Sequence, residues 1–120
     1  MKKSFYIAGG DLRSVYLAKS LIKEGHEVKV FALEGTNLPE NAEYIEKIEE
    51  FEKAKTVILP LPCSDGEGFL KTAFSKERIK LSEIVEHLQK GSVLMGGLLP
   101  EEIVSMAEKR GVSVCDYYFR

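Results

Sequence analysis

The sequence is poor in residues that hold metal ions and in closely spaced cysteines. Its two cysteines, Cys63 and Cys115, form no CxxC motif, and its two histidines, His26 and His87, are far from both along the chain. Zinc sites and redox motifs use such close spacings, and disulfides are rare in the cytosol. We therefore expect no metal site and no disulfide, and we interpret both thiols as small, buried or half-buried side chains.

A strong net charge and long apolar runs are also missing. The formal net charge is −2 over 120 residues, which gives no basis for general nucleic-acid binding. No apolar run approaches the roughly 20 residues that span a bilayer. The start of the chain, MKKSFYIAGG, superficially resembles a signal peptide, but its apolar patch is too short and runs into Gly-Gly-Asp. These absences predict a cytoplasmic protein that does not bind a membrane.

What the sequence does contain is a regular alternation of strand and helix patterns. Its length suits a single domain, residues 1–120. The alternation predicts an α/β fold, a flavodoxin-like or Rossmann-like three-layer sandwich with a parallel sheet of about five strands. The expected strands are residues 5–8, 27–33, 56–59, 92–95 and 112–117, with a brief extended edge at 44–45. The expected helices are residues 12–24, about 48–54, about 81–88, and one with Pro100 in its first turn.

Glycine-rich and polar turns follow the predicted strand ends. Gly9-Gly10-Asp11 follows the first strand, the segment SDGEG at 64–68 follows the third, and Gly96-Gly97 follows the fourth. Ligands of open α/β sheets bind beyond the carboxyl ends of the strands, so these turns should border one crevice. The residues expected to bind a substrate there are Gly10, Asp11, Arg13, Ser64, Asp65, Gly66, Glu67 and Gly97.

The first turn resembles a dinucleotide site without matching one. Counted from Gly9, the pattern G-x-G-x-x-G fails at its second and third glycines, where Asp11 and Ser14 stand. The Asp11 carboxylate would also repel a diphosphate by several kcal/mol before screening, at an effective dielectric constant of about 20. Glu34, near the end of the second strand, is a single weak match to a ribose-binding acid. We therefore expect no cofactor-binding residues in this domain.

Arg13 supports a different interpretation of the same turn. It lies in the first turn of the predicted helix, where free backbone N–H groups and a guanidinium together can hold a small anion such as a carboxylate. Asp11 is expected to cap this helix or to pair with Arg13. The simpler alternative is that Asp11 only caps the helix and Arg13 is only solvated.

The other turns give weaker signals. The segment 64–68 is either a flexible polar turn or part of a ligand cradle, and its two acids make it a poor phosphate loop. Gly96-Gly97 is either a second anion-facing turn or a tight corner between strand and helix. No Ser-His-Asp, Cys-His or paired-carboxylate arrangement can be assembled. No catalytic residue is assigned, and Asp65 and Glu67 are candidates only for proton transfer.

Three stretches together resemble a known family. They are IAGGDLRSVYLAKSLIKEGHEVKVF, VILPLPCSDGEGFLKTAFSKERIKLSEIV and VLMGGLLPEEI, and they are similar to the N-terminal domain of the A subunit of dipicolinate synthase. The family has a Gly-Gly-Asp-x-Arg first turn, an ILP strand, a DG/GEG loop and an FS…I.L stretch. All four occur here in this order and cover most of the chain.

The resemblance implies a role within a larger enzyme. The full subunit of that family is similar in plan to D-2-hydroxyacid dehydrogenases, with the active site between a flavodoxin-like first domain and a C-terminal NADP-binding domain. It works with a second, flavoprotein-like subunit to oxidise a dihydro- or hydroxytetrahydro-dipicolinate, a small dicarboxylate, to dipicolinate during sporulation. The implied location is the cytoplasm of the mother cell of a spore-forming bacterium. The present domain alone is then expected to be inactive and to bind no NADP.

Two other hypotheses remain open from the sequence. The chain is alternatively a standalone regulatory domain that binds a nucleotide or another small ligand, or a docking module for a partner subunit. A homo-oligomer is compatible with each of them. Binding of nucleotides by this chain favours the first alternative, and co-purification with a partner without ligand binding favours the second.

Overall fold

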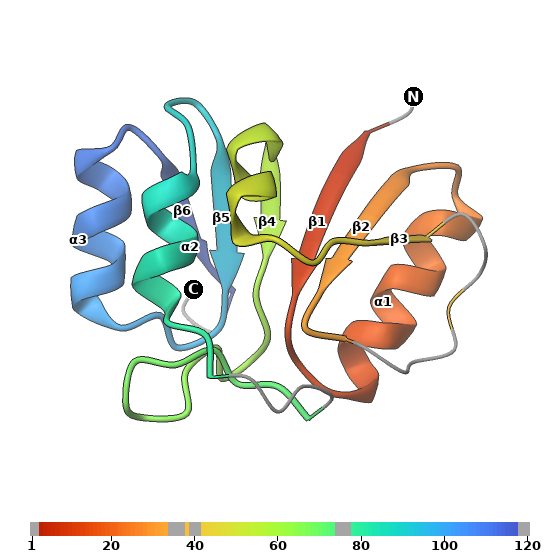
Figure 1. Cartoon of the computed structure of the whole chain (residues 1–120), viewed down its shortest axis with the longest axis horizontal. Helices are drawn as coiled ribbons and strands as arrows, with labels where there is room; N and C mark the ends of the chain where they lie inside the picture. Colours follow the sequence, from red (N-terminus) through yellow and green to blue (C-terminus); the bar gives the residue numbers. More distant parts are fainter. Residues whose placement is uncertain (1–2, 34–37, 39–41, 74–77, 118–120) are drawn as a thin grey trace.

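Strands and helices alternate along the chain in the computed structural model (Figure 1), which describes residues 3–33, 38, 42–73 and 78–117. Glu34 lies outside the described residues. The strands are β1 Ser4–Ala8, β2 Glu27–Phe31, β3 Ala42–Tyr44, β4 Thr56–Ile58, β5 Val93–Gly96 and β6 Ser113–Asp116. The helices are α1 Leu12–Lys23, the 3-10 helix η1 Ile48–Lys53, α2 Leu81–His87 and α3 Glu101–Lys109.

All six strands run parallel in one sheet with the order β3-β2-β1-β4-β5-β6. The predicted α/β class is thereby confirmed, with one strand more than the expected five. The additional strand is β3, a three-residue edge strand that pairs with β2. Its residues are half-buried or exposed, so it lacks the continuous apolar run that marks the central strands in the sequence.

The helix α1 begins where the sequence predicts it. Asp11 has an extended backbone and its side chain accepts a hydrogen bond from the amide of Arg13, as an N-cap residue does. Val15 and Ala18 are buried beneath the helix. Gly25, with φ of +92°, follows the last turn, because a left-handed residue closes a helix with little strain when it is glycine.

Most elements differ by one or two residues from their predicted bounds, and the strand expected at 27–33 ends at Phe31. Pro100 is the residue before α3 rather than part of its first turn, since its ψ of 143° is extended. The segment at 48–54 forms a short 3-10 helix. The last strand, β6, is limited to Ser113–Asp116. Such differences of one or two residues arise where end groups exchange helix or ladder hydrogen bonds for turn contacts.

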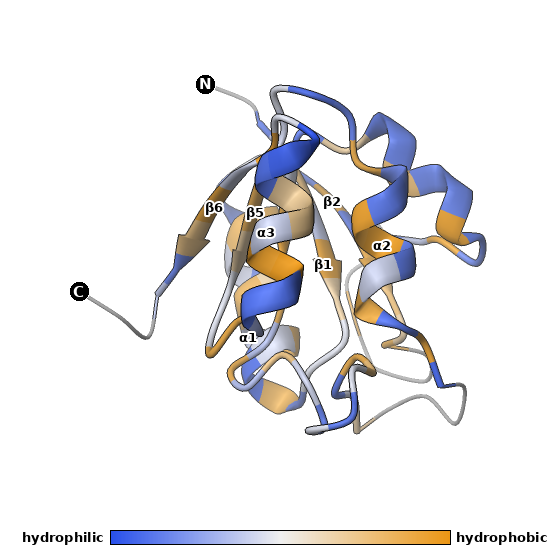
Figure 2. Cartoon of the chain, turned by 90° about the vertical axis from the view of Figure 1, so that its left-hand side faces the viewer, coloured by the Kyte–Doolittle hydropathy of each residue, from blue (hydrophilic) through white to orange (hydrophobic). Residues whose placement is uncertain are grey.

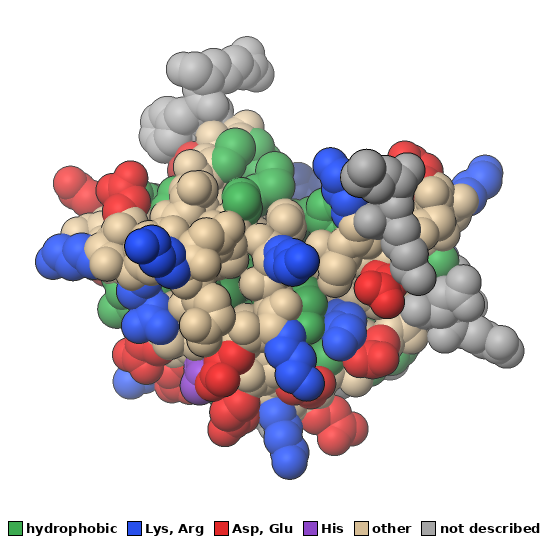
Figure 3. Space-filling model, turned by 90° about the horizontal axis from the view of Figure 1, so that it is seen from above, with side chains coloured by type: hydrophobic (Ala, Val, Ile, Leu, Met, Phe, Trp, Pro, Cys, Tyr) green, Lys and Arg blue, Asp and Glu red, His purple; other side chains and the backbone are tan. Residues whose placement is uncertain are grey.

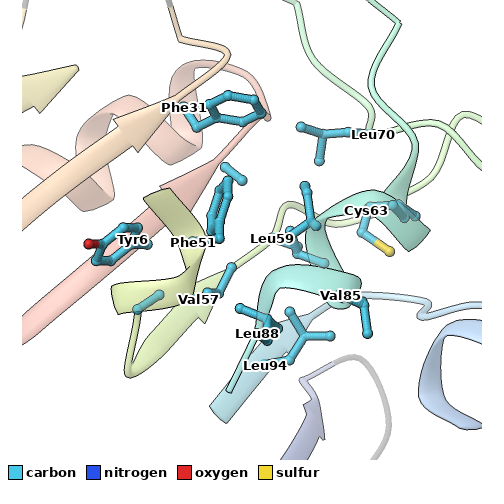
Figure 4. Close-up of a cluster of buried hydrophobic side chains, with 14 of the residues drawn as sticks. Tyr6, Phe31, Phe51, Val57, Leu59, Cys63, Leu70, Val85, Leu88 and Leu94 are labelled. Atoms are coloured by element: carbon cyan, nitrogen blue, oxygen red, sulfur yellow. The ribbon is translucent and has the colours of Figure 1, made fainter. Parts of the chain in front are cut away.

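The larger core lies on one face of the sheet, beneath η1, α2 and α3 (Figure 2). Figure 4 shows Phe51 of η1 between Tyr6 and Leu59, with Leu88 and Leu94 beside Val85. The Phe51 ring meets the Phe31 ring edge-on, with centroids 5.2 Å apart, an arrangement that aromatic pairs favour. The main core residues are Tyr6, Ala8, Phe31, Phe51, Val57, Leu59, Leu70, Leu81, Ile84, Val85, Leu88, Leu94, Ile103 and Ala107.

The opposite face carries a smaller core under α1. Ile7, Val28, Val30 and Leu33 of the sheet side pack with Ala18 of the helix. Successive strand residues point to opposite faces, which is why Ile7 belongs to this core and its neighbours Tyr6 and Ala8 to the other. Within the described ranges, no helix combines the length and the apolarity needed to cross a bilayer.

Candidate functional site

The carboxyl ends of β1 and β4 lie side by side, and the turns that follow them meet there. The backbone of Gly10 bridges to residues 71–73: its amide donates to the Lys71 carbonyl over 2.9 Å, and its carbonyl accepts from the Ala73 amide over 2.8 Å. Gly9 donates to the Phe31 carbonyl over 2.8 Å. The two glycine amides of this turn are therefore used within the chain.

Glycine is required at position 10 by the packing of the turn. Gly10 has φ of +111°, and a Cβ atom there would collide with the Oγ of Ser14 and approach Pro60. The first turn of α1 thus lies against the end of β4 with no room for a side chain. These glycines bring two chain segments together, which is a different use from admitting a pyrophosphate to the backbone.

Asp11 and Arg13 form the polar part of the turn. Oδ1 of Asp11 accepts from the Arg13 amide at 2.9 Å and from Nε at 3.2 Å, while Oδ2 accepts from Nη2 at 3.1 Å. Nη2 also donates to the carbonyl of Leu61 over 2.9 Å. The Arg13 side chain and amide hold the Asp11 pKa below its ordinary value, and the carboxylate raises the pKa of the guanidinium. Arg13 is thus tethered across the ends of β1 and β4, although its side chain is 70% exposed.

Two cavities share the wall that Asp11 and Arg13 form. The first has a volume of about 390 Å³ and is mostly apolar. The second, of about 230 Å³, lies on the side of residues 71–73. The first is lined by Asp11, Arg13, Ser14, Leu17, Ile58, Leu59, Pro60, Leu61, Met95 and Tyr117, and the second by Gly10, Asp11, Arg13, Pro60, Leu61, Pro62, Lys71, Thr72 and Ala73.

The second cavity brings together three of the residues expected from the sequence to bind a substrate, Gly10, Asp11 and Arg13, and adds Lys71. The sequence does not single out Lys71, because no local pattern marks one lysine in the long segment after β4. Its place depends on the pairing of Gly10 with Thr72, whose hydroxyl donates to the Ala32 carbonyl over 2.7 Å. Two cations therefore border a cavity that contains one carboxylate.

The SDGEG segment lines neither of these two cavities. Ser64 accepts from the Gly66 amide at 3.0 Å, and Asp65 accepts from the amides of Glu67 at 2.7 Å and Phe69 at 3.3 Å. These bonds make a compact turn of the kind that Asp and Ser side chains build with their own backbone.

Arg78 binds this turn from outside. Its guanidinium lies 3.6 Å from the Asp65 carboxylate, 3.9 Å from that of Glu67, and 4.1 Å above the centre of the Phe69 ring. Asp65 is only partly exposed in this arrangement, whereas Glu67 is largely exposed. The observed contacts give Asp65 a role in holding the loop, and they place no proton-transfer partner beside it.

Gly97 lies in a tight corner between β5 and α3. A Cβ atom at this position would collide with the side chain of Leu61. The two amides that follow, of Leu98 and Leu99, donate to the Asp116 carboxylate at 3.2 and 2.9 Å. Asp116 thus provides the anion that this turn binds, which favours the tight corner over a second ligand-facing turn.

Tyr117 also lines the first cavity. Its hydroxyl donates to the Leu59 carbonyl over 2.6 Å, and burial raises its pKa above the ordinary value. Cys63 is buried nearby, and desolvation raises the pKa of its thiol to about 11, so it is protonated at neutral pH.

His87 lines neither of these two cavities and lies beside Glu52, with its Nδ1 3.2 Å from Oε2 of Glu52.

Another cavity, of about 680 Å³, lies at the amino ends of the strands, opposite the site. Lys3, Lys29, Lys53 and Lys55 line it, and Lys29 pairs with Glu43 over 3.3 Å. Figure 3 looks onto this end and shows basic and acidic side chains close together. Among the described residues, no group of three His, Cys, Asp or Glu side chains is placed to hold a metal ion.

The family described as the N-terminal domain of the A subunit of dipicolinate synthase matches residues 4–118. This chain belongs to that family. Two solved structures of the dipicolinate synthase A subunit have the same fold. The structure from Bacillus halodurans is 17% identical, with a TM-score of 0.84 over 98% of this chain. The structure from Bacillus subtilis is 20% identical, with a TM-score of 0.82 over 98% of this chain. No curated protein matches by sequence.

The chain spans 41% and 40% of those two dipicolinate synthase chains. It also resembles shikimate dehydrogenase from Aquifex aeolicus, with 16% identity, a TM-score of 0.57, and coverage of 96% of this chain and 42% of the other. The dipicolinate synthase and dehydrogenase likenesses agree with the Rossmann-like class predicted from the sequence.

The first turn of this dipicolinate synthase family domain does not fit a dinucleotide. The amides of Gly9 and Gly10 are already bonded within the chain, and the Asp11 carboxylate occupies the beginning of α1. A diphosphate at this helix end would replace a bonded carboxylate without gaining the free amides that such sites provide.

Proposed function

We propose that this chain is the substrate-side domain of a longer protein, the A subunit of a dipicolinate synthase. In that subunit it contributes to the NADP-dependent oxidation of a dihydro- or hydroxytetrahydro-dipicolinate to dipicolinate during sporulation. The family match over residues 4–118 supports the proposal, as does the length of the two solved relatives, of which this chain spans about two fifths.

One observation carries the proposed binding role: Arg13 and Lys71 border the same cavity beyond the carboxyl ends of the strands. A guanidinium has five N–H donors. Within the described part of the chain, the hydrogen bonds of Arg13 use Nε and Nη2, which leaves the two hydrogens of Nη1 for a ligand. Asp11 therefore orients the guanidinium and does not have to be displaced by the substrate.

The proposed ligand is a small dicarboxylate. Nη1 of Arg13 binds one carboxylate through charge-assisted hydrogen bonds, and Lys71 adds a second positive charge for the anion. The negative charge of Asp11 cancels one of the two positive charges that border the cavity. Both Arg13 and Lys71 are therefore needed to attract an anionic ligand. The chemical role of this domain is to bind and orient the substrate, while no residue of it is assigned to proton transfer.

The remaining parts of the reaction are proposed to lie outside this chain. NADP accepts the hydride on the C-terminal domain of the subunit, in keeping with the poor fit of a dinucleotide to the first turn of this domain. The second, flavoprotein-like subunit is the proposed partner. The proposed location is the cytoplasm of the mother cell.

The test uses the complete two-subunit enzyme with Arg13→Ala and Lys71→Ala. A charge-assisted hydrogen bond contributes about 1.5–3 kcal/mol, so each variant should raise KM for the substrate roughly 10- to 100-fold. Lys109→Ala, which removes an exposed cation from α3, is the matched control. Unchanged KM and kcat in both site variants would reject the binding role. Micromolar binding of NAD or NADP by this chain alone would instead favour a regulatory domain.

A further inference from the structure

The amino ends of the strands border a cavity that the proposed function does not use. It has a volume of about 680 Å³ and lies at the end of the sheet opposite the proposed substrate cavity. Tyr6 of β1 is one of its walls and is paired with Lys29 of β2 on one side and with Val57 of β4 on the other. Lys53, the last residue of η1, lines the same cavity. The cavity is therefore built by three neighbouring strands and the end of a helix.

Positive charge is concentrated around this cavity. Its lining contains Lys3, Lys29, Lys53 and Lys55, together with the carboxylate of Glu27. Four positive charges and one negative charge give the lining a net charge of +3, although the complete sequence has a formal net charge of −2. Figure 3 views this end and shows basic side chains near the middle of the surface as well as at its edge. Like charges gathered in this way repel one another, so a bound multivalent anion would stabilise the cavity.

The backbone beneath two of these lysines is held by strand pairing. The carbonyl of Lys3 accepts from the Glu27 amide over 2.8 Å, and the carbonyl of Lys55 accepts from the Val93 amide over 2.8 Å. The two side chains therefore start from fixed points at the edge of the sheet. Because a ligand then has to order only the side chains and no loop, less conformational entropy is lost on binding.

Lys29 is the most buried of the four lysines. Its side chain is 28% exposed, and its Nζ lies 3.3 Å from Oε2 of Glu43 and 5.5 Å from the centre of the Tyr6 ring. The other three lysines make no ion pair with a described residue. Because Glu43 neutralises Lys29, these three positive charges face the single negative charge of Glu27, and a surplus of two positive charges is left for a ligand.

The chemistry of the lining suits phosphate better than carboxylate. A lysine ammonium is a compact point charge with three donors, and such a charge suits the tetrahedral phosphoryl group. The guanidinium fork of arginine matches a planar carboxylate instead. Among the described residues, the lining of this cavity contains four lysines and no arginine, whereas Arg13 borders the proposed substrate cavity. The two ends of the sheet thus differ in the anion they select.

We propose that this cavity binds a terminal diphosphate group, which comes either from free pyrophosphate or from a nucleoside diphosphate. Lys3, Lys53 and Lys55 bind the phosphoryl oxygens, and the Lys29–Glu43 pair forms a fixed wall. The proposal goes beyond the proposed function and does not depend on it, because the residues of the substrate cavity take no part.

Calorimetric titration of this chain with sodium pyrophosphate at low ionic strength tests the proposal. The double variant Lys53→Gln/Lys55→Gln should bind pyrophosphate at least about tenfold more weakly, because it loses two charge-assisted contacts. The matched control is Lys90→Gln/Lys109→Gln, which removes the same charge from exposed positions outside the cavity and should change the affinity less than about twofold. Equal losses in the two double variants, or no loss in either, would overturn the proposal.

Two further variants test the sign of the charge effect and the location of the anion. Glu27→Gln removes the negative charge from the lining and should strengthen pyrophosphate binding, and added sodium chloride should weaken it by screening. Arg13→Ala/Lys71→Ala should leave pyrophosphate binding unchanged. Loss of binding in that variant, with normal binding in Lys53→Gln/Lys55→Gln, would place the anion in the substrate cavity and overturn the proposal.

Titration with ADP distinguishes the two sources of the diphosphate. Equal affinities for ADP and pyrophosphate would identify the free diphosphate group as the whole ligand, and an affinity for ADP at least about tenfold higher would identify a nucleoside diphosphate. NAD, whose internal diphosphate lacks the terminal charge, should bind at least about tenfold more weakly than ADP. Binding of NAD as tight as that of ADP, or no binding of either diphosphate at millimolar concentration, would overturn the proposal.

Discussion

The guanidinium of Arg13 holds the carboxylate of Asp11 at two points, with Nε–Oδ1 and Nη2–Oδ2 distances of 3.2 and 3.1 Å. The same carboxylate caps α1 through the Arg13 amide. Asp11 therefore satisfies an unpaired amide at the helix start and fixes the direction of the side chain that we propose to bind the substrate. Capping and the proposed substrate orientation depend on one residue, so a change at Asp11 should affect both stability and binding.

The charge of Asp11 should make stability depend on pH. Its folded pKa lies below the ordinary value of 3.8 because the Arg13 side chain and amide donate to the carboxylate. The resulting stabilisation is fully present above pH 3.8 and is lost as the pH falls through the folded pKa. Asp11→Asn keeps a capping side chain but removes this charge.

Urea denaturation of the chain and of Asp11→Asn, from neutral pH downward, measures this effect. The stability difference between the two proteins should shrink as the pH falls below 3.8. Glu86→Gln, which removes an exposed carboxylate from α2, is the control. A difference that stays constant over the whole range would show that the charge of Asp11 contributes nothing.

Gly10 should tolerate alanine much less well than Gly66, although both have positive φ, +111° and +97°. A Cβ atom at Gly10 collides with Ser14, whereas one at Gly66 meets nothing within 4 Å. Overpacking costs about 1–3 kcal/mol, so Gly10→Ala should lower the free energy of unfolding by about that much more than Gly66→Ala. Adding Ser14→Ala to Gly10→Ala should recover part of the loss. Equal losses in the two single variants would refute the packing explanation.

Asp116 should stabilise the corner between β5 and α3. Its carboxylate accepts from the amides of Leu98 and Leu99, and Leu98 has an unfavourable φ of +56° for a residue other than glycine. Asp116→Ala should lower the free energy of unfolding by about 1.5–3 kcal/mol, the typical contribution of a hydrogen bond to a charged group. Asp116→Asn, with one acceptor oxygen left, should give an intermediate loss in the same thermal or urea denaturation, and Glu108→Ala on the exposed side of α3 should give almost none.

The fold and the start of α1 could be predicted because their signals are local. Alternating apolar runs mark the strands, and the position of Asp11 before an amphipathic segment marks the cap. The contacts that shape the site join distant residues instead: Arg13 donates to Leu61, 48 positions away, and Tyr117 to Leu59, 58 positions away. No spacing rule connects such pairs, because the pairing of β1 with β4 brings the first together, and the pairings of β4 with β5 and of β5 with β6 bring the second together.

The same reasoning explains why the sequence points to Asp65 and not to Lys71. The SDGEG segment attracts notice because acids and glycines are common in functional loops, but they are equally common in turns that bond to themselves. Lys71 has no distinctive neighbours, and only the bridge from Gly10 to Thr72 brings it to the cavity. Composition therefore identifies a loop, and tertiary pairing identifies the second cation.

Variants of Asp65 in the proposed two-subunit enzyme should separate a loop-holding role from proton transfer. Asp65 accepts from the amides of Glu67 and Phe69 and pairs with Arg78. Asparagine keeps the acceptor oxygen that the two amides use and cannot transfer the proton of a carboxyl group. If the loop-holding role is the whole role, Asp65→Asn should retain kcat within about threefold, a difference below 1 kcal/mol.

Asp65→Ala removes both amide contacts. Each net hydrogen bond contributes about 0.5–1.5 kcal/mol, so Asp65→Ala should lower the melting temperature more than Asp65→Asn does. Glu67→Gln, which changes the neighbouring and more exposed acid, is the control for altered loop charge. A loss of kcat of about 100-fold or more in Asp65→Asn, with an unchanged melting temperature, would assign Asp65 to catalysis. A loop-holding role spares the asparagine variant and proton transfer does not, so kcat and thermal stability measured on the same variants decide between them.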